Sequence, residues 1–209
     1  MSKVLLINGS PHEHGCTYTA LKEVADTLNK LGVDTEIYHL GAKPLQPCTA
    51  CGACKNLGEC VFKDDPVNEI GARLDEFQGI IVGSPVYYGG PSGAICTFMD
   101  RFCYTYGISK CAGKLAASVV SCRRGGATSA FERLNQYFAM LNMPIVPSQY
   151  WNQIHGNTPE EALQDIEGLQ TMRTLAQNMA WLLKCIEAGK AAGIEAPVYE
   201  DRTPTNFIH

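Results

Sequence analysis

The stretch that decides the fold is "KVLLINGSPHEHGCTYTAL", residues 3–21. Its first part, residues 3–9, is an unbroken apolar run of strand length, which is typical of a parallel strand buried on both faces. A helix is predicted directly afterwards, at about residues 17–31, because apolar residues recur every three to four positions until Gly32 stops the pattern. A buried strand that leads at once into an amphipathic helix indicates an α/β fold.

The same alternation of strand and helix continues along the chain. Further strands are predicted at residues 34–40, 79–85, 114–122 and 144–149. Further helices are predicted at residues 65–77, from about residue 91, at residues 128–141 and, as one long helix, at residues 158–187. Five strands that alternate with helices predict a flavodoxin-like, doubly wound, five-stranded parallel sheet of order 2-1-3-4-5.

We expect one domain with two appendages. The flavodoxin-like domain is predicted at residues 1–188, with a cysteine-rich insertion after the second strand at residues 44–64. The tail at residues 189–209 contains several chain breakers and no periodicity, so we expect it to be extended and to lie on a partner subunit.

The overall composition excludes several classes of protein. The chain has 209 residues, of which 45% are apolar and 18% charged, an ordinary balance for a globular domain. Its net charge of −4 and the lack of a basic run argue against nucleic-acid binding. No segment resembles a secretory signal or approaches the roughly 20 apolar residues of a membrane span. We therefore expect a cytoplasmic protein without membrane partners.

Three loops follow strands at the edge where doubly wound folds bind their ligands. The first loop, residues 8–19, is rich in Gly, Ser and Thr and leads into a helix, which suits a phosphate. It contains neither G-x-G-x-x-G nor a P-loop lysine, so dinucleotide or nucleoside-triphosphate binding by those motifs is disfavoured. Taken alone, this loop is also compatible with an ordinary turn that has Thr17 as helix N-cap.

The loops after the third and fourth strands complete the predicted pocket. Residues 83–93 hold two prolines and four glycines around Tyr87 and Tyr88, a backbone against which a flat aromatic cofactor could lie. Residues 121–128 hold two glycines that permit close approach, beside Arg123 and Arg124. Each loop alone is compatible with an ordinary solvated turn, but three ligand-ready loops at three neighbouring strand ends indicate one shared site.

Four of the ten cysteines lie within "CTACGACKNLGEC", residues 48–60, with the spacing C-x2-C-x2-C-x5-C. Such a run lets one loop wrap an iron–sulfur cluster, with its small intervening residues leaving room for the sulfides. Zinc sites of four cysteines usually join two C-x2-C knuckles by a longer loop. Zinc, local disulfides and four thiols without metal stay open as alternatives at this point. We expect most of the other six cysteines to be packing residues.

The motifs "GSPHEHGCTYTAL", "GSPVYYGGPSGAICTFMDR" and "PCTACGACKNLGECVFKDD" resemble the NADPH-dependent FMN reductase family of the flavodoxin-like superfamily. The third motif looks especially like the iron–sulfur flavoprotein branch, and the resemblance extends over residues 1 to about 150. It implies that the first loop holds the FMN phosphate through Ser10, His12, Cys16, Thr17 and Tyr18.

The same resemblance implies the rest of the site. The isoalloxazine ring would be flanked by Pro85, Val86, Tyr87, Tyr88, Gly89, Ser121, Arg123, Arg124, Gly125 and Gly126. A [4Fe-4S] cluster would be held by Cys48, Cys51, Cys54 and Cys60. The sequence departs from relatives that often carry Arg at the position of His12 and Asn at the position of Cys16. A thiol is a poor hydrogen-bonding group, so the second departure bears on the affinity for FMN.

The predicted function is FMN-dependent electron transfer. The flavin supplies its own chemistry, so no catalytic side chain is expected. Electrons would pass from NADPH or NADH through FMN to a small-molecule acceptor such as a flavin or quinone, and Arg123 or Arg124 would meet a nicotinamide phosphate. One alternative is an iron–sulfur flavoprotein that accepts single electrons from ferredoxin, and another is an FMN-binding module with neither activity. We expect a homodimer or homotetramer, in which a neighbour completes the pocket.

We expect no catalytic role for Asp64, Asp65, Trp151 or His155. Asp64 and Asp65 precede an apolar helical pattern, so N-capping accounts for them better than acid–base chemistry. Trp151 and His155 follow the last predicted strand and are expected either to close the edge of the pocket or to pack against the long helix.

Overall fold

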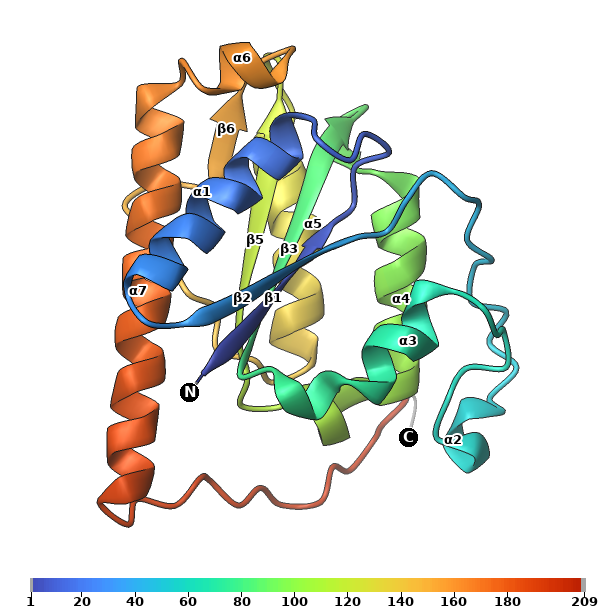
Figure 1. Ribbon diagram of the computed structural model, residues 1–209. Helices are drawn as coiled ribbons and strands as arrows, with labels where there is room; N and C mark the ends of the chain where they lie inside the picture. Colours follow the sequence, from blue (N-terminus) through green and yellow to red (C-terminus); the bar gives the residue numbers. More distant parts are fainter. Residues whose placement is uncertain (1, 208–209) are drawn as a thin grey trace.

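The first apolar run of the sequence forms the central strand β1 (Lys3–Asn8) in the computed structural model of the chain, which describes residues 2–207 (Figure 1). The other parallel strands are β2 (Asp34–His39), β3 (Gly79–Tyr87), β5 (Leu115–Cys122) and β6 (Gln153–His155). They lie in the order β2-β1-β3-β5-β6, and the two-residue strand β4 (Gly90–Pro91) pairs antiparallel with the end of β3. The predicted flavodoxin-like order 2-1-3-4-5 is confirmed.

Helices cover both faces of this sheet (Figure 1). One face carries α1 (Cys16–Lys30) and α7 (Ile166–Ala191), and the other carries α3 (Pro66–Ala72), α4 (Gly93–Cys111) and α5 (Ala127–Met140). Three short helices, α2 (Cys54–Leu57), η1 (Leu74–Glu76) and α6 (Pro159–Ala162), lie in the connections. β1 contributes side chains to the hydrophobic cores on both faces of the sheet, because Leu5 and Ile7 pack on one face while Val4 and Leu6 pack on the other.

The prediction of a strand at residues 144–149 is wrong. This segment makes only an isolated bridge between Ile145 and Ala116, and the fifth parallel strand lies later, at Gln153–His155. The ladder started by Val146, whose N–H donates to the carbonyl of Ala116 over 2.8 Å, stops there because the next carbonyl of β5 on this side, that of Ser118, accepts instead from Nδ2 of Asn152 over 3.0 Å.

The prediction of one helix at residues 158–187 is also wrong. Thr158 caps α6, which ends at Ala162 after one turn, and a new helix starts after Asp165. The carboxylate of Asp165 accepts from the N–H of Gly168 over 2.9 Å, so it serves as N-cap of α7, which ends at Ala191.

The ends of other elements differ by smaller amounts. The helix predicted from residue 91 starts at Gly93, because the residues before it pair with β3 as β4. The helix predicted at residues 65–77 is α3 followed by η1, and residues 194–206 adopt neither helix nor strand. In residues 2–207, no helix is both long and apolar enough to cross a membrane.

Gly9, at the end of β1, tests how tightly the strand ends are packed. A Cβ atom there would lie 2.7 Å from Cβ of Ile95 and 3.0 Å from the carbonyl oxygen of Gly83. We expect Gly9→Ala to lower the free energy of unfolding by about 1–3 kcal/mol, because the added methyl overpacks the site. Urea denaturation measures this. The control is Gly93→Ala, where nothing lies within 4 Å of the new atom. A Gly9→Ala protein as stable as the control would contradict the packing.

Glu36, on the edge strand β2, forms an ion-pair cluster with Arg73 and Lys3. The two terminal nitrogens of the Arg73 guanidinium each lie 2.7 Å from a carboxylate oxygen, and Nζ of Lys3 lies 2.8 Å away. The hydrogen bonds from Arg73, together with those from Lys3, lower the pKa of Glu36 from 4.5 to about 2. Because the folded pKa is the lower one, the stabilisation is complete above pH 4.5 and is lost as the pH falls toward 2.

We therefore expect Glu36→Gln to flatten the loss of stability in acid. Native protein should lose stability more steeply than the variant between about pH 5 and about pH 2.5, as measured by urea midpoints at several pH values. Glu195→Gln, on the exposed chain after α7, is the control and should keep the native slope. Parallel curves for native protein and Glu36→Gln would show that this carboxylate does not contribute.

Candidate functional site

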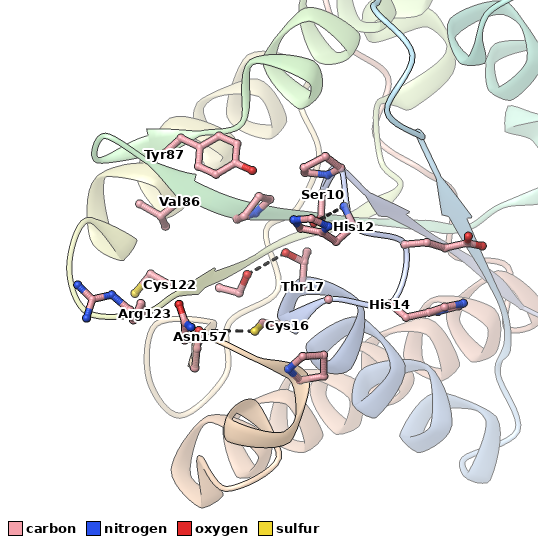
Figure 2. Close-up of a pocket in the computed structure, with 17 residues that line it drawn as sticks. Ser10, His12, His14, Cys16, Thr17, Val86, Tyr87, Cys122, Arg123 and Asn157 are labelled. Carbon is pink, nitrogen blue, oxygen red and sulfur yellow. Dashed lines mark hydrogen bonds between the residues drawn. The ribbon is translucent and has the colours of Figure 1, made fainter.

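The carboxyl ends of β1, β3 and β5 open into one cleft of about 750 Å³ (Figure 2). Its walls come from residues 10–17 after β1, residues 85–87 at the end of β3 and residues 121–123 at the end of β5. The loop between β6 and α6 closes a fourth side. A cleft of this volume at the topological switch point is large enough for a nucleotide-sized cofactor.

The N-terminus of α1 points its first turn into this cleft. Gly15 is the N-cap and supplies no side-chain cap, and the first turn carries no acidic residue. The first N–H groups of a helix have no partner within the helix, and they form its positive end. Thr17 lies in this turn, so it is not the N-cap, and its Oγ1 is 2.8 Å from Oγ of Ser121 on β5. The uncapped helix end and the hydroxyl pair fit a phosphate.

Asn8, a buried residue at the end of β1, holds the first loop in shape. Its Oδ1 accepts from the N–H of Ser10 over 3.1 Å, and its Nδ2 donates to the carbonyl of Glu13 over 3.0 Å. The hydroxyl oxygen of Ser10 in turn accepts from the N–H of His12 over 3.1 Å, as Figure 2 shows. The loop is therefore ordered by its own hydrogen bonds.

A hairpin at the end of β3 forms the opposite wall. Tyr88 and Gly89 have φ angles of 50° and 80°, the combination found in tight two-residue hairpin turns. A Cβ on Gly126 would lie 2.9 Å from both the Cα of Gly89 and the Cγ1 of Val86, so only glycine lets the loop after β5 pack here. Ser129 also donates a hydrogen bond to the carbonyl of Gly89. The two loops thus form one rigid wall with its backbone near the cleft.

The structure brings together most of the predicted cofactor-binding residues. Those that line the cleft are Ser10, His12, Cys16, Thr17, Pro85, Val86, Tyr87, Ser121 and Arg123. In the part of the chain that the structure describes, six predicted residues do not line the cleft: Tyr18, Tyr88, Gly89, Arg124, Gly125 and Gly126. The ring of Tyr18 packs edge-on against His14, and Tyr88 is fully exposed in the turn between β3 and β4.

Sequence reasoning missed the fourth side of the cleft. Gly156, Asn157 and Pro159 line it, although their stretch carries no binding motif, and Cys122 was missed too. The chain reaches this place only because β6 pairs with β5 and α6 then turns back over the strand ends. The sequence predicts Trp151 and His155 either at the pocket edge or against the long helix. Neither is among the described residues that line the cleft. The N–H of His155 donates instead to Asp165, the N-cap of α7, over 2.7 Å.

Cys16 contacts this fourth side. Its thiol donates to the carbonyl of Gly156 over 3.5 Å (Figure 2). Burial raises the pKa of the Cys16 thiol, so the sulfur stays neutral near neutral pH. A neutral thiol places no negative charge beside an anionic ligand.

The four cysteines of the motif line a second, small hollow of about 20 Å³. Cys48 and Cys51 are exposed, Cys54 is partly buried, Cys60 is buried, and all four are free thiols. Among residues 2–207, no three His, Cys, Asp or Glu side chains are gathered so that they could hold a single metal ion. A mononuclear zinc site is therefore not preformed. Four thiolates are also the usual ligands of iron–sulfur clusters, in which each thiolate takes a different iron.

Asp65, beside this hollow, has the predicted capping role. Its carboxylate accepts from the N–H of Val67 over 3.0 Å at the start of α3, which has Pro66 at its first position.

Comparison with known proteins identifies the family. The model of the NADPH-dependent FMN reductase family matches residues 2–158. The chain belongs to this family. An iron-sulfur flavoprotein of Methanocaldococcus jannaschii is 33% identical over 193 residues, which cover 88% of this chain and 99% of the relative. The resemblance inferred from the three sequence motifs is confirmed, including the iron–sulfur flavoprotein branch.

Solved structures agree on the fold of this FMN reductase family member. RosB with bound 8-demethyl-8-formylriboflavin-5'-phosphate superimposes with a TM-score of 0.71 at 14% identity, covering 99% of this chain and 92% of RosB. A flavodoxin-type, WrbA-like protein from Agrobacterium tumefaciens gives a TM-score of 0.64 at 17% identity, over 88% of this chain and 99% of that one. At these identities the likeness shows the flavodoxin-like fold.

Thr17→Val tests whether the helix end of the cleft holds a phosphate, because valine has nearly the same shape as threonine but cannot donate a hydrogen bond. Loss of a hydrogen bond to a charged group costs about 1.5–3 kcal/mol, so we expect the dissociation constant of FMN to rise roughly 10- to 150-fold. Flavin fluorescence titration of the apoprotein measures this. The control is Thr174→Val on α7, whose hydroxyl donates to Gln149 at the surface. An unchanged dissociation constant of FMN in Thr17→Val would show that this hydroxyl does not contribute to FMN binding.

Proposed function

We propose that this chain is an FMN-dependent oxidoreductase that holds FMN in the cleft at the strand ends. The observation that carries the proposal is the convergence of three strand-end loops on one cleft that has an uncapped helix N-terminus on one side. Membership in the FMN reductase family supports the same assignment. Bound FMN would supply hydride and single-electron chemistry that the side chains of this protein cannot supply.

The residues of the cleft would bind and orient the cofactor from two ends. Ser10 and Thr17, with the first N–H groups of α1, would hold the phosphate, and His12 and Arg123 would add donors at the rim. The hairpin backbone at Val86 would lie against the ring. N–H groups directed at the ring would stabilise the negative charge that it gains on reduction.

The cysteine hollow is the second part of the proposal. Cys48, Cys51, Cys54 and Cys60 would hold a [4Fe-4S] cluster, supported by their spacing, their common hollow and the name of the 33% identical relative. The exposure of Cys48 and Cys51 would bring the site within reach of a protein partner. This exposure favours ferredoxin as a donor of single electrons.

A hydride donor is the second candidate. The name of the family model and the position of Arg123 at the rim of the open cleft favour NADPH or NADH. In either case the electrons would leave to a small-molecule acceptor such as a flavin or quinone. The two candidates differ in the donor that reduces the bound flavin.

Anaerobic purification followed by donor competition tests these assignments. We expect the native protein to contain FMN, iron and sulfide, and we expect reduced ferredoxin to bleach the flavin absorbance faster than NADPH or NADH does. Faster bleaching by NADPH would select the second candidate. Colourless protein that does not bind added FMN would overturn the whole proposal.

A cysteine variant separates the two cofactors in that experiment. Cys51→Ser should lose most of the iron and sulfide and keep the FMN, because it removes one thiolate of the proposed set without touching the cleft. Cys185→Ser, an exposed cysteine on α7, is the matched control and should keep both. Native iron content in Cys51→Ser would exclude this thiolate as a ligand.

A further inference from the structure

Arg101, on α4, is the bulkiest of the fully buried side chains, with 1% of its surface exposed. Arginine is almost never buried to this degree unless its charge is paired. The functional cleft does not account for it, because Arg101 lines the cysteine hollow instead. A buried cation beside four thiols therefore needs its own explanation.

The guanidinium contacts the cysteine loop at both of its ends. Nε and Nη2 donate to Sγ of Cys60 over 3.3 and 3.2 Å, and Nη1 pairs with the carboxylate of Asp65. Nη1 also donates to the carbonyl of Gln46, and Nη2 to that of Phe62, both over 3.3 Å. The guanidinium lies 5.1 Å from the centre of the Phe62 ring. Two of its N–H groups thus converge on one sulfur.

Cys60 is held more firmly than the other cysteines of the motif. Its N–H donates to Oδ1 of Asn68 and its carbonyl accepts from Nδ2 of the same side chain, each over 2.8 Å. The hydroxyl of Tyr106 fixes Asn68 with a further bond of 3.1 Å. Cys48 and Cys51, by contrast, lie exposed on a segment without helix or strand. Contacts within the protein therefore anchor one of the four sulfurs, that of Cys60.

We propose that Arg101 is a positioning residue that holds Cys60 as the anchored ligand of the cluster and favours the reduced state of that cluster. The proposal rests on the proposed function, since it needs a cluster on these cysteines. Hydrogen bonds to cluster sulfurs are among the features that set a cluster's reduction potential. A buried, permanently charged donor acts strongly because little water screens it.

The redox event itself is simple. Reduction adds one electron, supplied in the test by dithionite, and neither breaks nor forms a covalent bond. Arg101 keeps its proton in both states, because a guanidinium does not deprotonate in proteins. Its contribution is the stronger attraction of two N–H groups to a sulfur that carries more negative charge after reduction.

Arg101→Lys distinguishes donation of hydrogen bonds to Cys60 from mere neutralisation of the Asp65 carboxylate by a nearby positive charge. Lysine keeps the charge but cannot direct a rigid fork of two N–H groups at one sulfur. In holoprotein with FMN and full iron content, we expect the midpoint potential of the cluster to fall by at least about 59 mV. That is a tenfold change in the ratio of reduced to oxidised cluster for a one-electron couple. Redox titration followed by electron paramagnetic resonance measures it.

Arg133→Lys on α5 is the matched control. Arg133 also lies over a ring, 4.1 Å from the centre of Tyr137, and near the carboxylate of Asp100 at 3.6 Å, but it donates to the hydroxyl of Tyr137. Its substitution should leave the potential unchanged. A native potential in iron-replete Arg101→Lys would overturn the proposal while leaving the cluster itself established.

A measurement on the native protein covers the case in which Arg101→Lys does not fold. Of the described residues that line the hollow, Arg101 is the one arginine. Protein labelled with ¹⁵N-arginine should therefore show nitrogen hyperfine coupling to the reduced cluster in pulsed electron paramagnetic resonance spectra. Absence of coupling would overturn the role of Arg101 alone. Native protein that takes up no iron and sulfide would overturn both the role of Arg101 and the proposed cluster. Flavin titration of the same protein tests FMN binding separately.

Discussion

The arrangement of the whole molecule depends on the register of three parallel strands. Asn8 at the end of β1 pairs with Gly83 of β3, and Pro85, slightly further along β3, pairs with Ser121 of β5. Because parallel strands end at the same edge of a sheet, this register delivers three loops to one level. Gly83 is part of the constraint, since a Cβ there would lie 2.7 Å from Leu21 of α1. Without that close approach, α1 could not bring its N-terminus over the strand ends.

Helix α4 connects the two sites that this arrangement creates. At its start, the hydroxyl of Ser92 donates to the carbonyl of Gly9 over 2.7 Å, and the N–H of Ser92 donates to Ser84 over 2.9 Å. Two turns later Arg101 reaches Cys60 in the cysteine hollow. The first part of this one helix therefore holds both the edge of the cleft and the end of the cysteine loop at Cys60.

The two sites differ in how many hydrogen bonds within the protein hold their loops. The loop of the cleft is ordered by the side chain of Asn8 and by the hydroxyl of Ser10. The cysteine loop is ordered at Cys60, while Cys48 and Cys51 remain exposed. A thiolate set that completes itself around a metal is usual, because binding energy then contributes to folding. The first loop of the cleft is thus held along its length by hydrogen bonds, whereas the cysteine loop is held mainly at Cys60.

The sequence by itself determined the alternation of strands and helices, the three glycine-rich loops and the cysteine motif, because hydrophobic periodicity and turn chemistry are local. Only the tertiary structure decided that the fifth strand lies at Gln153–His155 and that Asn157 enters the cleft. The buried position of Arg101 belongs to the same class, since its partner Cys60 lies 41 residues away. Such features follow from contacts between distant segments, and no local pattern encodes them.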